Sequence, residues 1–377
     1  MKRDPTKPNP LSQIYEVSHV TEYQFERNRR GEIMNKLTGW IKQHQVATFF
    51  VITFATAFGI MVPGIIVFSG DQFLNQIIQF HMARLGVFSP VLAGMIITKV
   101  VIPGHRKGSR RARWIVFFPT WILAWSVSVL YIQHTTPSDN LPIIILVTGP
   151  VALLPAFVIS GAFSRIEGIR SYLSTLVRPR GNLVWYLVAL FTFPAIHILG
   201  NAITRILGGG SSEANSGVGA DLVILTIITF LHVLLYTGGI NEESGWRGFA
   251  LPRLQVRYSP LVASLVIWFF HAIWELPGDV IFSGSSSWPA MSRLVWMPCW
   301  TVLFAWVYNR TEGSILAPAL FHASMNAMNP LMDVLPTTDA GTILLISAAL
   351  FAIMYDRMWE KLPAYDPAVY PAAEQAA

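Results

Sequence analysis

Two adjacent glutamates and an arginine follow a long apolar stretch of the chain. Glu242 and Glu243 follow residues 222–240 with only Asn241 between, and Arg247 lies four residues after Glu243. On a helix, this spacing places Glu243 and Arg247 on one face with the acid N-terminal, and leaves Glu242 about 100° away. The arginine would hold Glu243 charged and steady the helix, while a desolvated acid beside a like charge suits a general base. Glu242 is therefore the candidate base, although an ion pair at the lipid headgroup level, with Glu242 solvated, would show the same spacing.

His322 and Asn326 form a second pair, because they lie four residues apart within the apolar stretch 315–328 and share one helical face. An imidazole and an amide supply two directed hydrogen-bond donors. Donors aimed at a developing oxyanion are worth about 10²–10³ in rate each, and a neutral imidazole would add no charge within lipid. The alternative for a histidine in a membrane helix is a hydrogen bond that holds two helices together.

His271 lies within the aromatic segment 267–275, whose bulky side chains could exclude bulk water. We expect it to help Glu242 orient and deprotonate a water molecule, with packing between helices as the alternative. Glu275 is four residues further on and is a further possible partner of His271. Its nearness to Pro277 and to the following loop favours a solvated, structural role, so it stays outside the predicted catalytic set.

A metal is the open question for these residues. Glu242, His271 and His322 could be three ligands of a catalytic zinc ion with an open fourth position. The sequence lacks the His-Glu-x-x-His helix of zincin-type metalloproteases, and its single cysteine, Cys299, excludes a thiolate zinc cluster and an internal disulfide. A divalent metal such as zinc and a metal-free glutamate mechanism both fit, and we favour the metal-free version.

The elements that must position these side chains are membrane helices. Of the 377 residues, 53% are hydrophobic and 13% charged, and the apolar residues form long uninterrupted stretches, which is typical of an integral membrane protein. Only helices are plausible, because lipid offers no partners to backbone polar groups. We predict an all-α polytopic bundle of eight to ten membrane helices, and two short segments, 294–308 and 315–328, are expected to be tilted, broken or re-entrant. The ten predicted spans are 46–69, 85–101, 114–131, 141–163, 183–207, 222–240, 261–277, 294–308, 315–328 and 343–358.

Basic residues set the expected orientation. They cluster at 106–113 and 165–180, whereas the Gly/Ser-rich loops 208–220 and 278–289 carry almost none, which places both chain ends in the cytoplasm. The net charge of +6 therefore reflects topology, and no soluble basic domain suggests nucleic-acid binding. Without a cleavable signal peptide and without an organelle signal, the chain fits a prokaryotic plasma membrane. We divide it into a basic cytoplasmic arm (1–45), N-terminal membrane helices (46–182), a core that carries the motifs (183–330), and a last helix with a cytoplasmic tail (331–377).

The order of the motifs resembles that of a known family. Glu-Glu-x-x-x-Arg, a later histidine and His-x-x-x-Asn occur in this order in the CPBP intramembrane proteases, which include type II CAAX prenyl endopeptidases and bacteriocin-processing or immunity (Abi-like) proteins. The match is strongest over 242–255 and extends over about 183–328. The family's second motif usually has phenylalanine four residues before the histidine, where this chain has Ile267.

The resemblance implies an endopeptidase that hydrolyses a peptide bond near the C-terminus of a prenylated or other membrane-associated protein or peptide within a lipid bilayer. In this mechanism, Glu242 and His271 activate water, while His322 and Asn326 stabilise the oxyanion. Two other classes stay open on the residues alone. Buried ionisable groups also mark the pathways of proton- or ion-coupled transporters, and a family member could act as a non-proteolytic scaffold or immunity protein.

Overall fold

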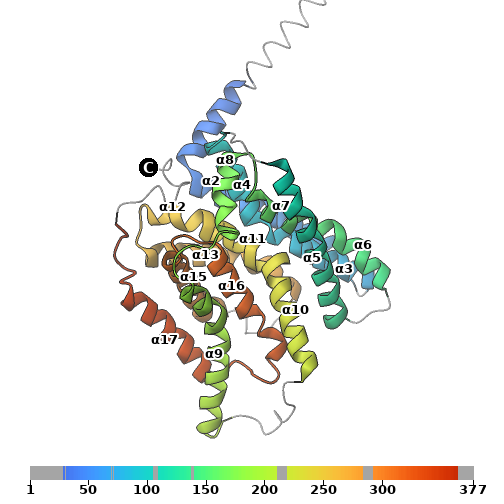
Figure 1. The fold of residues 1–377 in the computed structure, drawn as a ribbon, viewed down its shortest axis with the longest axis vertical. Coiled ribbons are helices and arrows are strands. Elements are labelled where there is room, and N and C mark those ends of the chain that lie inside the picture. Colours follow the sequence, from blue (N-terminus) through green and yellow to red (C-terminus); the bar gives the residue numbers. More distant parts are fainter. Residues whose placement is uncertain are drawn as a thin grey trace, which may run out of the picture.

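The chain folds into a bundle of helices (Figure 1). The computed structural model describes residues 29, 31–68, 70, 72–104, 109–136, 140–209, 219–282 and 292–363, and no strand occurs among them. All ten predicted spans fall mainly in helices, as expected for an all-α polytopic fold. The predicted tail beyond residue 363, most of the basic arm and the basic residues at 106 and 107 lie outside the described residues.

Seven helical segments of the described chain are long and apolar enough to cross a membrane, which makes this a multi-pass membrane protein. The prediction of eight to ten crossings counted three further helices. These have only 14, 11 and 17 residues, and about 20 are needed to span the hydrocarbon core. The three short helices are α15 (Met297–Arg310), α16 (Leu316–Asn326) and α17 (Asp339–Tyr355).

The first half of the chain forms one side of the bundle. Its helices are α2 (Gln45–Val67), α3 (Phe73–Val87), α4 (Ser89–Val101), α5 (Arg110–Thr135), α6 (Leu141–Val151), α7 (Leu153–Gly161) and α8 (Glu167–Leu173). The N-terminal part of α3 was not predicted as part of a span, because it is interrupted by Asn75, Gln76, Gln79, His81 and Arg84. In the structure α3 leads almost directly into α4, and together they form one apolar segment, Phe73–Val101.

The second half contributes the remaining helices. They are α9 (Val184–Ile206), α10 (Ala220–Tyr236), α11 (Gly238–Gly245), α12 (Leu251–Gln255) and α13 (Pro260–Phe282), followed by the three short helices. Helices α10 and α11 lie between the group α3, α5, α6 and α7 and the group α9, α15, α16 and α17 (Figure 1). Helix α10 packs on both α5 and α16, and α11 packs on both α4 and α16. Every residue of α11 is consequently buried, although the helix carries two carboxylates.

A break at Thr237 separates α11 from α10. The Thr237 backbone has φ −121° and ψ −123°, which no helical residue adopts. The Asn241 amide donates hydrogen bonds to the carbonyl oxygens of Thr237 at 2.8 Å and Leu235 at 3.3 Å, so part of the backbone freed by the break is satisfied. The break lets the chain change direction immediately before the paired glutamates.

A close approach between α11 and α4 fixes the other end of α11. A Cβ atom at Gly245 would lie 2.2 Å from Cβ of Pro90, so only glycine fits there. The Tyr172 hydroxyl of α8 donates to the carbonyl oxygen of Ser244 at 2.7 Å. Burial raises the pKa of Tyr172 well above its usual value, so this donor stays neutral. Helix α11 therefore has one end set by the break at Thr237 and the other fixed by contacts with α4 and α8.

Candidate active site

Glu243 and Arg247 form the ion pair that their spacing predicts. The Arg247 Nη1 atom lies 2.9 Å from Glu243 Oε1, and both side chains are buried. Arg247 lies in a π-helical turn, Trp246–Ala250, and its guanidinium sits 4.6 Å from the centre of the Phe304 ring. The pair is thus inside the bundle, and the alternative of a pair exposed at the headgroup level does not describe this structure.

His322 of α16 contacts the same carboxylate. Its Nδ1 atom lies 2.9 Å from Glu243 Oε1, and its ring stacks on Phe304 with the ring centres 5.6 Å apart. Because a carboxylate paired with arginine accepts hydrogen bonds, Nδ1 must carry the proton of this bond. A neutral imidazole protonated at Nδ1 has no proton on Nε2. With Nδ1 donating to Glu243, a donor at Nε2 would require the imidazolium form, so the oxyanion role of His322 stays a prediction that depends on this protonation state.

Glu242 pairs with His271 of α13. The Glu242 Oε2 atom lies 3.0 Å from His271 Nε2. The imidazole stacks on Trp246 with ring centres 4.8 Å apart, and Trp274 packs against it at 5.6 Å. Trp274 is in turn held by a hydrogen bond from its indole to the Ser89 hydroxyl at 3.1 Å. The aromatic surroundings predicted for this histidine are thus present, and they fix the plane of its ring.

Glu275 also reaches His271, the partner that its four-residue spacing allows, although Glu275 was left outside the predicted catalytic set. Its Oε1 atom lies 3.3 Å from His271 Nε2, and its Oε2 atom lies 3.2 Å from Arg293 Nη1. Arg293 further donates to the carbonyl oxygen of Ala272 at 2.6 Å. The side chain of Glu275 is 34% exposed, so it keeps contact with solvent while it pairs with His271 and Arg293. The four-residue spacing from His271 was the available signal, but the partner Arg293 is supplied from a distant part of the chain.

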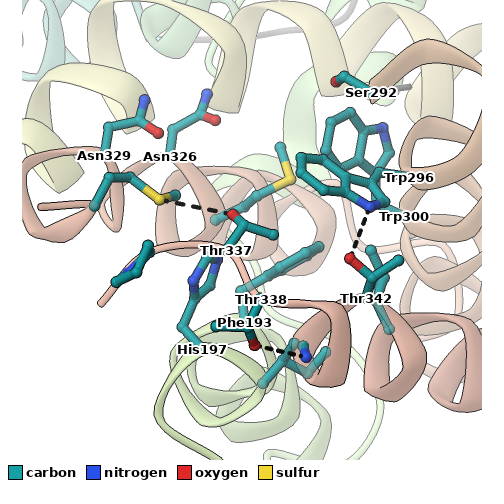
Figure 2. Close-up of a pocket in the computed structure, with 16 residues that line it drawn as sticks. Phe193, His197, Ser292, Trp296, Trp300, Asn326, Asn329, Thr337, Thr338 and Thr342 are labelled. Atoms are coloured by element: carbon teal, nitrogen blue, oxygen red, sulfur yellow. Dashed lines mark hydrogen bonds between the residues drawn. The ribbon is translucent and has the colours of Figure 1, made fainter. Parts of the chain in front are cut away.

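Asn326 lies apart from these ion pairs. It is the last residue of α16, it is half-buried, and it lines a cavity of about 180 Å³. Figure 2 shows Asn326 and Asn329 beside each other at one edge of this cavity, opposite the indole rings of Trp296 and Trp300, with His197 below. Within the part of the chain that the structure describes, no hydrogen bond ties the Asn326 amide to Glu242 or His271. The amide faces a space that a ligand could enter.

Three side chains could hold a metal ion. One ligand atom from each of Glu242, His271 and Glu275 lies within 4.8 Å of the other two, and His322 is not part of this group. Two carboxylates and an imidazole suit a divalent cation such as zinc. However, a metal-bound histidine usually donates its second N–H to an acceptor, and His271 Nδ1 is buried without a hydrogen-bond partner among the described residues. These three residues are of the types that bind a divalent metal, but among the described residues His271 lacks the hydrogen bond that usually supports a metal-bound histidine.

Comparison with known proteins identifies the region that contains these residues. Residues 223–328 match the family described as type II CAAX prenyl endopeptidase, Rce1-like. The chain is also 27% identical over 196 residues to a protein named CAAX prenyl protease 2 from Methanococcus maripaludis, and the alignment covers 48% of this chain and 70% of that protein. All three motifs lie within the matched region. The resemblance predicted from the motifs is thereby confirmed: over these residues the chain is similar to type II CAAX prenyl endopeptidases, and it is a peptidase.

Proposed function

We propose that the protein cleaves a peptide bond near the C-terminus of a prenylated or other membrane-associated protein, with a water molecule activated by Glu242 and His271 and without a metal. One observation carries the proposal. Glu242 Oε2 lies 3.0 Å from His271 Nε2, while the next residue of the same short helix, Glu243, is held by Arg247 and His322. Side chains of all three motifs thus meet at α11.

The chemistry follows from the geometry of the Glu242–His271 pair. The Nε2–H group of His271 donates to one oxygen of Glu242 and leaves the other oxygen to accept a proton from water. The water oxygen attacks the carbonyl carbon of the substrate, and the carbonyl oxygen becomes an oxyanion. Glu242 then returns the proton to the amide nitrogen as the C–N bond breaks. The products are a new carboxylate on one fragment and an amine on the other.

The oxyanion would be stabilised by His322 and Asn326. Gly238 and Glu242 are four residues apart on one face of α11, and His322 Nε2 lies directly against Gly238, so the imidazole sits about one helical turn, roughly 5 Å, from the base along this face. As an imidazolium, His322 would donate from Nε2 while Glu243 accepts the hydrogen bond from its Nδ1 atom. The Asn326 amide would donate from the edge of the cavity of about 180 Å³. We propose that this cavity, rich in apolar and aromatic side chains, takes an apolar part of the substrate.

The orientation also belongs to the proposal. Arg110, Arg113 and Arg165 lie together around one surface pocket, which gathers positive charge at one end of the bundle. We place this end, and both chain termini, in the cytoplasm of a prokaryotic cell. Should a divalent cation bind, Glu242, His271 and Glu275 would hold it, and it would supply Lewis-acid activation of the water.

The test is cleavage of a prenylated C-terminal peptide by the purified protein in liposomes. We expect Glu242→Gln and His271→Ala to abolish cleavage, because the first removes the base and the second removes the group that orients it. A matched control is Glu360→Gln, which changes an exposed glutamate outside the site. Full activity in Glu242→Gln would refute the assignment of the base. A biological effect of the protein that persists in both variants, although neither cleaves the peptide, would favour a scaffold.

A further inference from the structure

A second buried polar cluster lies beside α11 and outside the three motifs. Helix α3 contributes His81 and Arg84, α10 contributes His232 and Tyr236, and α5 contributes Tyr131. The His232 imidazole stacks on Tyr131 with ring centres 4.0 Å apart and a 3° angle between the planes, and on Tyr236 at 5.2 Å. The two tyrosines hold the faces of this imidazole, so its ring nitrogens remain at the edge.

Three ring nitrogens of the cluster are buried without a hydrogen-bond partner in the described part of the chain. His232 is only 1% exposed, and neither of its ring nitrogens has a hydrogen-bond partner among the described residues. His81 bonds the Ile77 carbonyl oxygen through Nδ1 at 2.7 Å, and its Nε2 atom is likewise buried without a partner there. Buried polar groups are usually hydrogen-bonded, and each exception calls for an explanation. One explanation is a ligand that brings hydrogen-bond acceptors.

Arg84 adds a positive charge to the cluster. Its guanidinium lies 4.7 Å from the centre of the Phe80 ring, and Phe80 in turn stacks on His232 with ring centres 6.4 Å apart. Arginine presents a planar fork of N–H groups that matches a carboxylate, and it keeps its charge at any working pH. The ligand that suits an arginine flanked by imidazoles is therefore an anion, and a carboxylate has the best geometry.

The cluster is close to the proposed base. Tyr236 is the last residue of α10, six positions before Glu242, and α3 packs directly on α11. An extended peptide advances about 3.3 Å per residue, so two or three residues beyond a bond held at Glu242 span roughly 7–10 Å. A chain end in this range can reach helix α3, which packs on α11 and carries Arg84 in its last turn.

We propose that Arg84, His81 and His232 bind the free α-carboxylate of the substrate and so direct cleavage to a peptide bond a few residues from a chain end. This inference rests on the proposed function and deepens it, because it names the feature of the substrate that the N-terminal helices recognise. It also assigns a role to α3, which lies outside the matched region 223–328.

The experiment compares two prenylated peptides that differ only in a C-terminal carboxylate or carboxamide. Binding is measured by fluorescence anisotropy to the Glu242→Gln protein in nanodiscs, with empty nanodiscs subtracted, so the result does not depend on cleavage. A charge-assisted contact predicts that the free acid binds about 10–100-fold more tightly. Adding Arg84→Gln should remove this preference, and Arg84→Lys should retain part of it.

Two further variants separate recognition from folding. His232→Phe keeps an aromatic ring against Tyr131 but has no N–H group, and it should reduce the preference for the acid while leaving thermal stability close to that of the parent. Arg178→Gln removes an exposed arginine elsewhere and should leave the preference intact.

Equal affinity for acid and amide in the parent protein, or a preference that survives Arg84→Gln, would overturn the carboxylate site. Failure of the wild type to cleave either peptide would instead count against the proposed function. The binding comparison would still show whether the cluster recognises a carboxylate. Anionic lipid bound in the cluster would compete with the peptide carboxylate, so an acid preference that is lost in anionic nanodiscs and present in neutral ones would assign the cluster to lipid phosphate and overturn the proposal.

Discussion

Replacing Gly238 with alanine adds a methyl group where the His322 imidazole already lies. A Cβ atom at this position would be 2.3 Å from His322 Nε2 and 2.4 Å from Cε1. Ordinary contacts between such atoms lie near 3.5 Å, so the ring must move by about 1 Å. The movement acts on the ring that Glu243 holds at 2.9 Å.

The expected effect falls on catalysis more than on stability. Alanine gains up to about 1 kcal/mol over glycine inside a helix, and overpacking typically costs about 1–3 kcal/mol, so the net change in the free energy of unfolding is about 0–2 kcal/mol. A displacement of 1 Å within a catalytic arrangement costs about 10²-fold in rate. We therefore expect kcat/KM to fall about 100-fold in Gly238→Ala while the protein remains folded.

The assay is kcat/KM for a prenylated peptide in liposomes, together with the thermal unfolding midpoint. Gly59→Ala in α2 is the matched control, because it makes the same substitution within a helix at a position where nothing lies within 4 Å of the new Cβ. Activity of Gly238→Ala within about threefold of the wild type would show that His322 does not work from the position seen here, and would refute its role in stabilising the oxyanion.

Three further outcomes follow from the same contacts. Glu243→Gln should destabilise the fold by about 3–5 kcal/mol, because Arg247 would be left buried with an uncompensated charge, whereas Glu360→Gln should change the unfolding midpoint little. Tyr172→Phe should lower the free energy of unfolding by about 1 kcal/mol, because the hydrogen bond to Ser244 is lost. This loss should be the same at about pH 6 and about pH 9, because burial raises the pKa of Tyr172 and its phenol stays neutral at both. Cleavage by the wild type should persist in excess chelator, and a complete loss that zinc restores would contradict the metal-free mechanism.

The helices and the motif residues were predictable because their signals are local. Long apolar stretches mark membrane helices wherever they pack, and a four-residue spacing places Glu243 with Arg247 on one face in any helix. The same argument placed His322 and Asn326 on one face of α16. It could not show that they face different surroundings, since His322 bonds Glu243 while Asn326 lines a cavity.

The remaining features depend on contacts between distant segments. Glu275 was set aside because its neighbours in the sequence suggested solvent, and only the fold brings Arg293 to it. Helix α3 was missed because polar residues interrupt its apolar pattern, and those residues include His81 and Arg84 of the second cluster. A local pattern cannot distinguish a polar residue that faces water from one that faces a buried site, so the sequence alone underestimates what α3 contributes.

The two glutamates of α11 have parallel partners but different access, and this difference separates their roles. Each bonds one histidine at about the same distance, 3.0 Å for Glu242 with His271 and 2.9 Å for Glu243 with His322. The side chain of Glu243 is fully buried and paired with Arg247, so it is shielded from water and already engaged in an ion pair. The side chain of Glu242 keeps 9% of its exposure, enough for contact with a water molecule. Exchanging the two proposed functions would require moving the arginine, so under the proposed mechanism the order Glu-Glu-x-x-x-Arg assigns the water to the first glutamate and the support of the opposite histidine to the second.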